Sequence, residues 1–167
     1  PKLTEKLRDR VHLRQITADR TVVLLPFQNG APQPTIRIQW PEPPQELLND
    51  LEVPIDGYPD ATASLRISKL KSSSEGRTSS YSPHGIEIRG AKTTIGNTFY
   101  GEAGPETTWL RCVLTCEYID DLVRSYDEDD ERGADPKNPI RILRRDRDGL
   151  AEDHPFTRAL ATAVLTV

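Results

Sequence analysis

The stretch TWLRCVLTCEYIDDLVRSY, residues 108–126, decides the fold because it joins the clearest strand pattern in the chain to a helix pattern. Apolar residues alternate with other residues from Leu110 to Tyr118, which predicts a strand over residues 108–119. Beyond that point apolar residues recur every three or four positions, which predicts a short helix over residues 119–126. A strand that leads directly into a helix indicates a sheet with helices packed against it.

The two cysteines of this stretch, Cys112 and Cys116, fall on the same face of the predicted strand. Four residue steps place their Cα atoms roughly 13 Å apart, whereas a disulfide needs a separation below about 7 Å. We therefore expect reduced cysteines that act as small hydrophobic core residues, as in a cytosolic protein. No further ligands occur at the spacing of a zinc site.

The rest of the chain mixes strand and helix patterns. Strands are expected at residues 21–25, 35–40, 61–70, 85–90 and 140–143. Helices are expected at residues 3–15, at residues 45–50 and from about residue 155 to the end. Turns or loops are expected at residues 28–34, 54–61, 72–84, 91–108 and 127–139. This order predicts an α+β fold, with a mixed β-sheet and helices on one face.

Two parts are expected along the 167 residues. Residues 1–50 would form an N-terminal helix and strands, at the junction with a missing domain, and residues 51–167 would form the α/β domain. The sequence begins at Pro1 and contains no methionine, so we expect a piece of a longer protein.

Composition and charge narrow the class of protein. Hydrophobic residues make up 35% of the chain and charged residues 29%, which is typical of a globular domain. The net charge of −4 disfavours a dedicated nucleic-acid binder, which usually presents a basic face. The sequence shows neither a signal peptide nor the roughly 18 consecutive apolar residues of a membrane span. We therefore expect a cytoplasmic protein without a membrane partner.

The stretch RRDRDGLAEDHPF, residues 144–156, concentrates charge immediately before the last predicted helix. Pro155 suits the first helical position, where its missing N–H would have no partner. His154 then becomes the N-cap, and the negative charge of Asp153 is favoured near a helix N-terminus. Gly149 supplies a tight turn. This interpretation makes the stretch a structural cap.

Two other interpretations of the stretch stay open. Asp146, Asp148 and His154 could converge on a metal ion and make the chain a metal-dependent hydrolase or nuclease. Alternatively, the basic cluster from Arg144 to Arg147 could make it an interaction module, for which binding to nucleic acid would depend steeply on salt. No G-x-S-x-G elbow, phosphate-binding loop or dinucleotide fingerprint is present.

Three segments carry a resemblance to a known family. In order, they are GIEIRGAKTTIGNTFY (85–100), WLRCVLTCEYIDDLVRSY (109–126) and DPKNPIRILRRDRDGLAEDHPFTRAL (135–160). Together they resemble the region that follows the nucleotide-binding domain in GHKL ATPases, a superfamily that includes gyrase, mismatch-repair ATPases, heat-shock chaperones and histidine kinases. The resemblance covers roughly residues 54–160.

The resemblance implies a transducer domain with a fold like that of a small-subunit ribosomal protein. Such a domain reaches one basic residue toward the γ-phosphate of the nucleotide, and the candidates here are Lys137, Arg144, Arg145 and Arg147. Loss of that phosphate on hydrolysis is a local electrostatic event that the domain converts into a larger movement.

The resemblance also implies which partners and cofactors to expect. The motifs of the ATP site itself are missing, so we expect no activity in isolation and no cofactor in this piece, with ATP and Mg²⁺ bound by the parent protein. The expected partners are an N-terminal ATP-binding domain of the same chain and a second copy in a homodimer.

Overall fold

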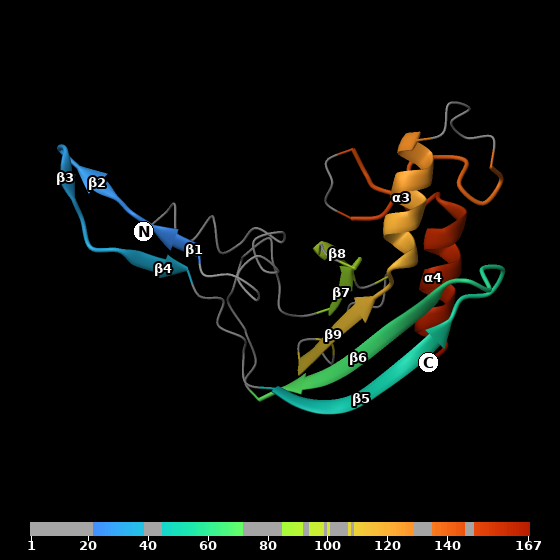
Figure 1. The fold of residues 1–167 in the computed structure, drawn as a ribbon. Helices are drawn as coiled ribbons and strands as arrows, with labels where there is room; N and C mark the ends of the chain where they lie inside the picture. Colours follow the sequence, from blue (N-terminus) through green and yellow to red (C-terminus); the bar gives the residue numbers. More distant parts are fainter. Residues whose placement is uncertain are drawn as a thin grey trace.

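The computed structural model describes residues 22–38, 45–71, 85–91, 94–98, 100, 107, 109–128, 135–145 and 149–167. Figure 1 shows a body, in which helices pack on a sheet, and a β-hairpin arm that lies away from it. The helix expected at residues 3–15 and the loop expected at residues 72–84 lie outside the described residues.

The body is built on a five-stranded mixed sheet with the order β5-β6-β9-β7-β8. β9 lies in the middle of the sheet, antiparallel to β6 and parallel to β7, and the other neighbouring strands are antiparallel. The strands are β5 (Gln45–Pro54), β6 (Thr62–Leu70), β7 (Gly85–Arg89), β8 (Thr94–Thr98) and β9 (Leu110–Thr115). The predicted α+β class, with a mixed sheet, is confirmed.

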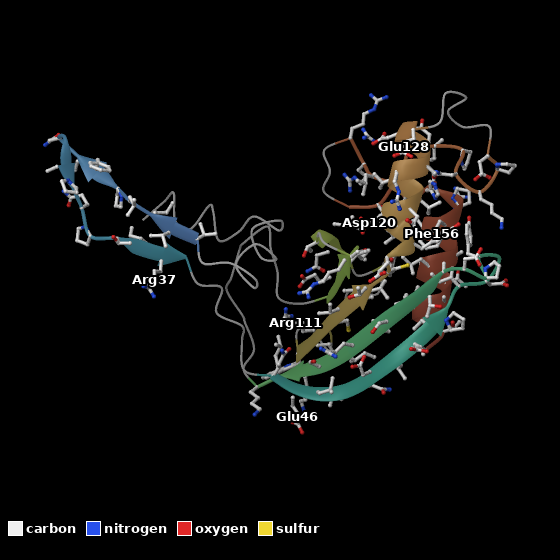
Figure 2. The ribbon with its side chains drawn as sticks, viewed as in Figure 1. Arg37, Glu46, Arg111, Asp120, Glu128 and Phe156 are labelled. Atoms are coloured by element: carbon white, nitrogen blue, oxygen red, sulfur yellow. The ribbon has the colours of Figure 1, made fainter. Side chains whose placement is uncertain are left out.

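Helices α3 (Tyr118–Glu128) and α4 (Pro155–Leu165) lie side by side on one face of this sheet (Figure 1). Phe156 of α4, labelled in Figure 2, is fully buried and stacks edge-on against Tyr58 with a centroid distance of 4.9 Å. Its ring centroid also lies 5.3 Å from that of Tyr118 on α3. The core between helices and sheet therefore includes an aromatic cluster that joins both helices to the β5–β6 turn.

The start of α3 is also fixed to the turn after β7. The Asp120 carboxylate, labelled in Figure 2, accepts a hydrogen bond of 2.6 Å from the backbone N–H of Ala91. A Cβ atom at Gly90 would lie only 2.6 Å from both oxygens of that carboxylate. Glycine at this position therefore leaves room for the Asp120 carboxylate, which would have to shift if residue 90 carried a side chain.

The arm is one β-hairpin. β1 (Val22–Leu24) pairs with β4 (Ile36–Ile38), and β2 (Phe27–Gln28) pairs with β3 (Ala31–Pro32). Asn29 and Gly30 form the tip with φ values of 53° and 79°, as a type I′ turn requires. Within the described residues, the strands predicted at residues 21–25 and 35–40 are confirmed as β1 and β4, whereas the turn predicted at residues 28–34 also contains β3 and the end of β2.

The prediction of a short helix at residues 45–50 is wrong, because these residues form the first half of β5. They pair with β6 in antiparallel register, with a β-bulge between Leu47 and Asn49. Leu47 and Leu48 are both exposed, so their adjacency does not mark a buried helical face. Pairing with a distant strand outweighs the local helical preference of this segment.

Two further expectations fail. Residues 140–143 are not a strand, because their backbone bonds go to the segment that follows. Ala151 N–H donates to the Ile142 carbonyl oxygen and Arg144 N–H donates to the Gly149 carbonyl oxygen, and in the described part of this segment the pairing is an isolated bridge between Leu143 and Leu150. Residues 91–108 are not only loop, because they contain strand β8. Its sequence TIGNT has a single aliphatic residue, so it carries no alternating pattern.

The cysteines behave as predicted. Both are free thiols, Cys116 is fully buried, and Cys112 is partly buried against the core. Burial raises the pKa of both thiols, so the unreactive protonated form is favoured.

Candidate functional site

The N-terminus of α4 is capped by His154, as the sequence predicts. Its backbone is extended, with φ −68° and ψ 132°, and Pro155 occupies the first helical position. The Nδ1 atom of His154 accepts a hydrogen bond of 3.1 Å from the Phe156 N–H. Because an imidazole nitrogen that accepts carries no proton, the neutral ring must hold its proton on Nε2.

The other ring nitrogen joins this cap to helix α3. His154 Nε2 lies 3.0 Å from the Asn138 amide oxygen, so it donates there. The Asn138 amide nitrogen in turn donates to the backbone oxygen of Leu122 and to the Ser125 hydroxyl, both at 2.9 Å. The result is a buried chain of hydrogen bonds that ties the start of α4 to the middle of α3.

This geometry leaves His154 without a lone pair for a metal ion or a substrate. The side chain is fully buried, and both nitrogens already have partners. Asp146 and Asp148, the other members of the proposed metal cluster, lie outside the described residues. Among the residues that the structure describes, no three His, Cys, Asp or Glu side chains come together as metal ligands do.

A cavity of about 490 Å³ lies directly beside the cap. One wall is α4, which contributes Thr157, Arg158 and Ala161, and the opposite wall is β8 with its continuation to Tyr100. Buried aliphatic side chains, Ile88 among them, supply its apolar lining. This volume falls within the range of roughly 300–1,000 Å³ that is typical of small-molecule sites.

Two residues that line this cavity, Tyr100 and Thr157, carry buried hydroxyl groups for which the described part of the chain offers no hydrogen-bond partner. Thr157 is 5% exposed, and its Oγ1 atom is buried without a hydrogen-bond partner. The hydroxyl of Tyr100 is buried in the same way. Burial, followed by the charge of Cys116, raises the pKa of the Tyr100 phenol to about 12, so it keeps its proton and can donate.

The structure separates the basic residues that the sequence proposed as phosphate sensors. Arg144 and Arg145 are both exposed, and of the two only Arg144 lines the cavity. The Lys137 ammonium lies 5.7 Å from the centroid of the Tyr58 ring, as in a cation–π contact. Arg147 lies outside the described residues. Arg144 is thus the only described member of the set that borders a cavity of ligand size.

The cavity itself was not predicted from the sequence. Tyr100 belongs to a segment without periodicity, and Thr157 and Arg158 fall within a helix whose apolar spacing is ordinary. Only the approach of β8 to α4 brings these side chains together. The feature of the sequence that points toward this cavity is the position of Arg144 just before a predicted turn and helix.

A second polar cluster lies on strands β7 and β9. Glu87 and Arg111 are 2% and 3% exposed, and an Arg111 Nη2 atom lies 3.5 Å from Glu87 Oε2. Arg89 adds a contact of 2.9 Å to the other carboxylate oxygen. Because opposite charges and hydrogen bonds compensate one another here, we interpret the cluster as structural.

Comparison with known proteins gives no match: no protein-family model fits the chain, and neither a curated protein nor a solved structure matches it. Across the described ranges, neither helix has the length and apolar character needed to cross a membrane.

Proposed function

We propose that this chain is a non-catalytic domain of a larger GHKL-type ATPase, which relays the nucleotide state to the rest of that protein. The family resemblance of residues 54–160 motivates the proposal, including its ribosomal-protein-like fold. A mixed sheet with two helices on one face is compatible with it at the level of fold class. The use of His154 as a cap weighs against the competing metal-dependent hydrolase.

The observation that carries the proposal is the position of Arg144. This residue borders the cavity beside the N-terminus of α4, where Arg158 adds a second guanidinium group. Two guanidinium groups and the positive end of a helix dipole favour an approaching phosphate. Among the candidate sensors, Arg144 therefore has the most suitable surroundings.

A route for the relay follows from the hydrogen bonds around this residue. The Arg144 N–H donates to the Gly149 carbonyl oxygen at 3.1 Å, which closes the turn that leads into α4. The cap at His154 then connects α4 through Asn138 to α3. An electrostatic pull on Arg144 would act on this turn, and through it on both helices.

The proposal is tested first with the purified 167-residue chain and Mg²⁺–ATP. We expect no turnover above buffer, measured as released phosphate. Steady hydrolysis that co-purifies with the folded chain, and that a point variant of this chain removes, would contradict the proposal.

The second test uses the full-length product of the gene. The variant Arg144→Ala is expected to lower ATP turnover by roughly tenfold or more, as loss of one charge-assisted contact predicts. Arg145→Ala is the matched control, because this neighbouring arginine is exposed and does not border the cavity. Equal activity of the two variants would refute the role of Arg144.

A further inference from the structure

We infer that two copies of this chain associate through the β-hairpin arm, residues 22–38, whose apolar face docks on the exposed first half of strand β5 in the second copy. The surfaces involved are not those of the proposed nucleotide relay, so the inference goes beyond that function and does not depend on it. Each copy offers one arm and one β5 strand, so a twofold axis closes the dimer with two equivalent contacts.

The arm exposes an apolar face. Its strands pair with each other and not with the five-stranded sheet, and Figure 1 shows the arm directed away from the body. Partly buried and exposed residues alternate from Val22 to Phe27, which places Leu25 and Phe27 on one face, where they are 68% and 69% exposed. An isolated two-stranded hairpin is only marginally stable in water, so a surface that covers this face would stabilise the arm.

Strand β5 offers a surface of the same kind. It lies at the edge of the sheet, where its neighbour among the described strands is β6. Residues 45–50 are all exposed, and they include the adjacent leucines Leu47 and Leu48. The free edge of a strand that also exposes apolar side chains favours contact with a strand of another molecule.

The charges of the two surfaces are complementary. Arg37 lies opposite Val23 in the hairpin register, so its side chain is on the same face as the exposed apolar residues. No acidic residue occurs in the arm, whereas β5 has three acidic residues and no basic residue. Arg37 and Glu46, both labelled in Figure 2, are exposed, and their side chains form no ion pair within the described part of the chain. Each can therefore accept a partner of opposite charge.

The same charges disfavour a simpler dimer in which β5 pairs with β5 of the second copy. An antiparallel register centred on Asn49 would place Glu46 opposite Glu52. A register centred on Leu48 would place Glu46 opposite Asp50. Like charges in directly opposite positions destabilise a strand pair, and the β-bulge in this half of β5 disturbs regular pairing further. The arm, which has no acidic residue, is the better matched partner.

Sedimentation equilibrium of the purified 167-residue chain tests the association. We expect a monomer–dimer equilibrium with a Kd on the order of 10 µM, as for a small interface. The dimer should weaken as the salt concentration rises, because exposed charges contribute to it.

Two variants of the arm test the residues that are named. Phe27→Ser removes an exposed ring and should raise the Kd of the dimer roughly tenfold. Val167→Ser is its control, because this side chain is 63% exposed at the other end of the chain and should change the Kd by less than about twofold. Arg37→Glu should raise the Kd roughly tenfold at low salt, since it places an acidic residue against the acidic strand. Arg145→Glu, at an exposed position of the body, is the control for charge reversal.

Amide hydrogen exchange locates the contact. In the dimer, backbone amides of the arm and of residues 45–50 should both exchange more slowly than at a chain concentration at which the monomer predominates. The amides of α3 and α4 should exchange at the same rate in both states, because these helices lie outside the proposed contact.

Three results would overturn the inference. The first is a chain that stays monomeric at the highest concentration reached. The second is a dimer whose Kd is the same in Phe27→Ser, Arg37→Glu and the wild type, which would locate the interface elsewhere. The third is equal protection of both surfaces in the monomer, which would mean that the arm docks on β5 of its own chain. None of these results bears on ATP turnover, so failure here is distinct from failure of the proposed relay function.

Discussion

The two sides of the start of α4 use polar side chains in opposite ways. On the side that faces α3, the side chains of His154 and Asn138 are buried. Both ring nitrogens of His154, and the amide oxygen and nitrogen of Asn138, have hydrogen-bond partners in the protein. On the side of β8, the hydroxyls of Thr157 and Tyr100 are equally buried but have none. His154 and Thr157 are only three residues apart in sequence.

This difference shows two ways in which one helix end buries polar groups. A saturated network stabilises the fold and has nothing left to offer a ligand. The unsatisfied hydroxyls of Thr157 and Tyr100 lower the stability of the fold. The stretch with the most conspicuous imidazole is therefore structural, and the cavity beside it is lined by residues one helical turn further on.

The largest expected effect is on the saturated side. His154→Ala removes the cap and leaves the Asn138 amide oxygen buried without its donor, so we expect a loss of about 2–4 kcal/mol in the free energy of unfolding. Urea denaturation of the purified chain measures it. His154→Asn is the matched control, because asparagine is a good N-cap and should restore about 1 kcal/mol. A loss below about 0.5 kcal/mol for His154→Ala would show that the network contributes nothing.

The pH dependence of stability gives the next largest effect. Burial lowers the pKa of His154 below 6.5, although the nearby Asp153 carboxylate acts in the opposite direction. The unfolded chain therefore binds a proton at His154 below about pH 6.5, while the folded chain resists it. The contribution of neutral His154 to the free energy of unfolding is complete above that pH and declines as the pH falls.

Titration of His154 alone is expected to change the free energy of unfolding by at most about 1.4 kcal/mol per pH unit. Urea denaturation at pH 5.5, 6.5 and 7.5 measures this slope. The same series with His154→Asn gives the contribution of the other titrating groups, which is then subtracted from the wild-type slope. If wild type and variant lose stability in parallel, the folded state does not exclude the proton from His154.

The smallest effect has the opposite sign and lies on the unsaturated side. Thr157→Val should raise the free energy of unfolding by about 1 kcal/mol, because a methyl group replaces an unpartnered buried hydroxyl. Thr162→Val, which loses an exposed hydrogen bond to a helix carbonyl, should change stability by less than about 0.5 kcal/mol. Thermal denaturation of the two variants gives the comparison. Destabilisation by Thr157→Val would show that its hydroxyl has a structural partner.

The same contrast explains what could be predicted from the sequence. The cap follows from local rules, because Pro155, His154 and the turn at Gly149 act within a few residues of one another. Strand β9 and helix α3 were also predictable, since their apolar periods are regular.

What could not be predicted depends on contacts between distant segments. The sequence of the first half of β5 predicts a helix, because only the pairing with β6 makes this segment a strand. β8 has almost no apolar residues to alternate. The cavity needs β8, Tyr100 and α4 together, so no local pattern could reveal it. The basic residues could be named from the sequence, but only the fold distinguishes Arg144 from Arg145.

The state of the His154 ring tests the central claim most directly. Long-range ¹H–¹⁵N spectra of the purified chain report the protonation of each ring nitrogen. We predict a neutral ring with its proton on Nε2, which persists below pH 6.5 and does not change when Zn²⁺ or Mn²⁺ is added. A ring that takes up a proton at or above pH 6.5, or a nitrogen signal that shifts on coordination of either metal, would contradict the account.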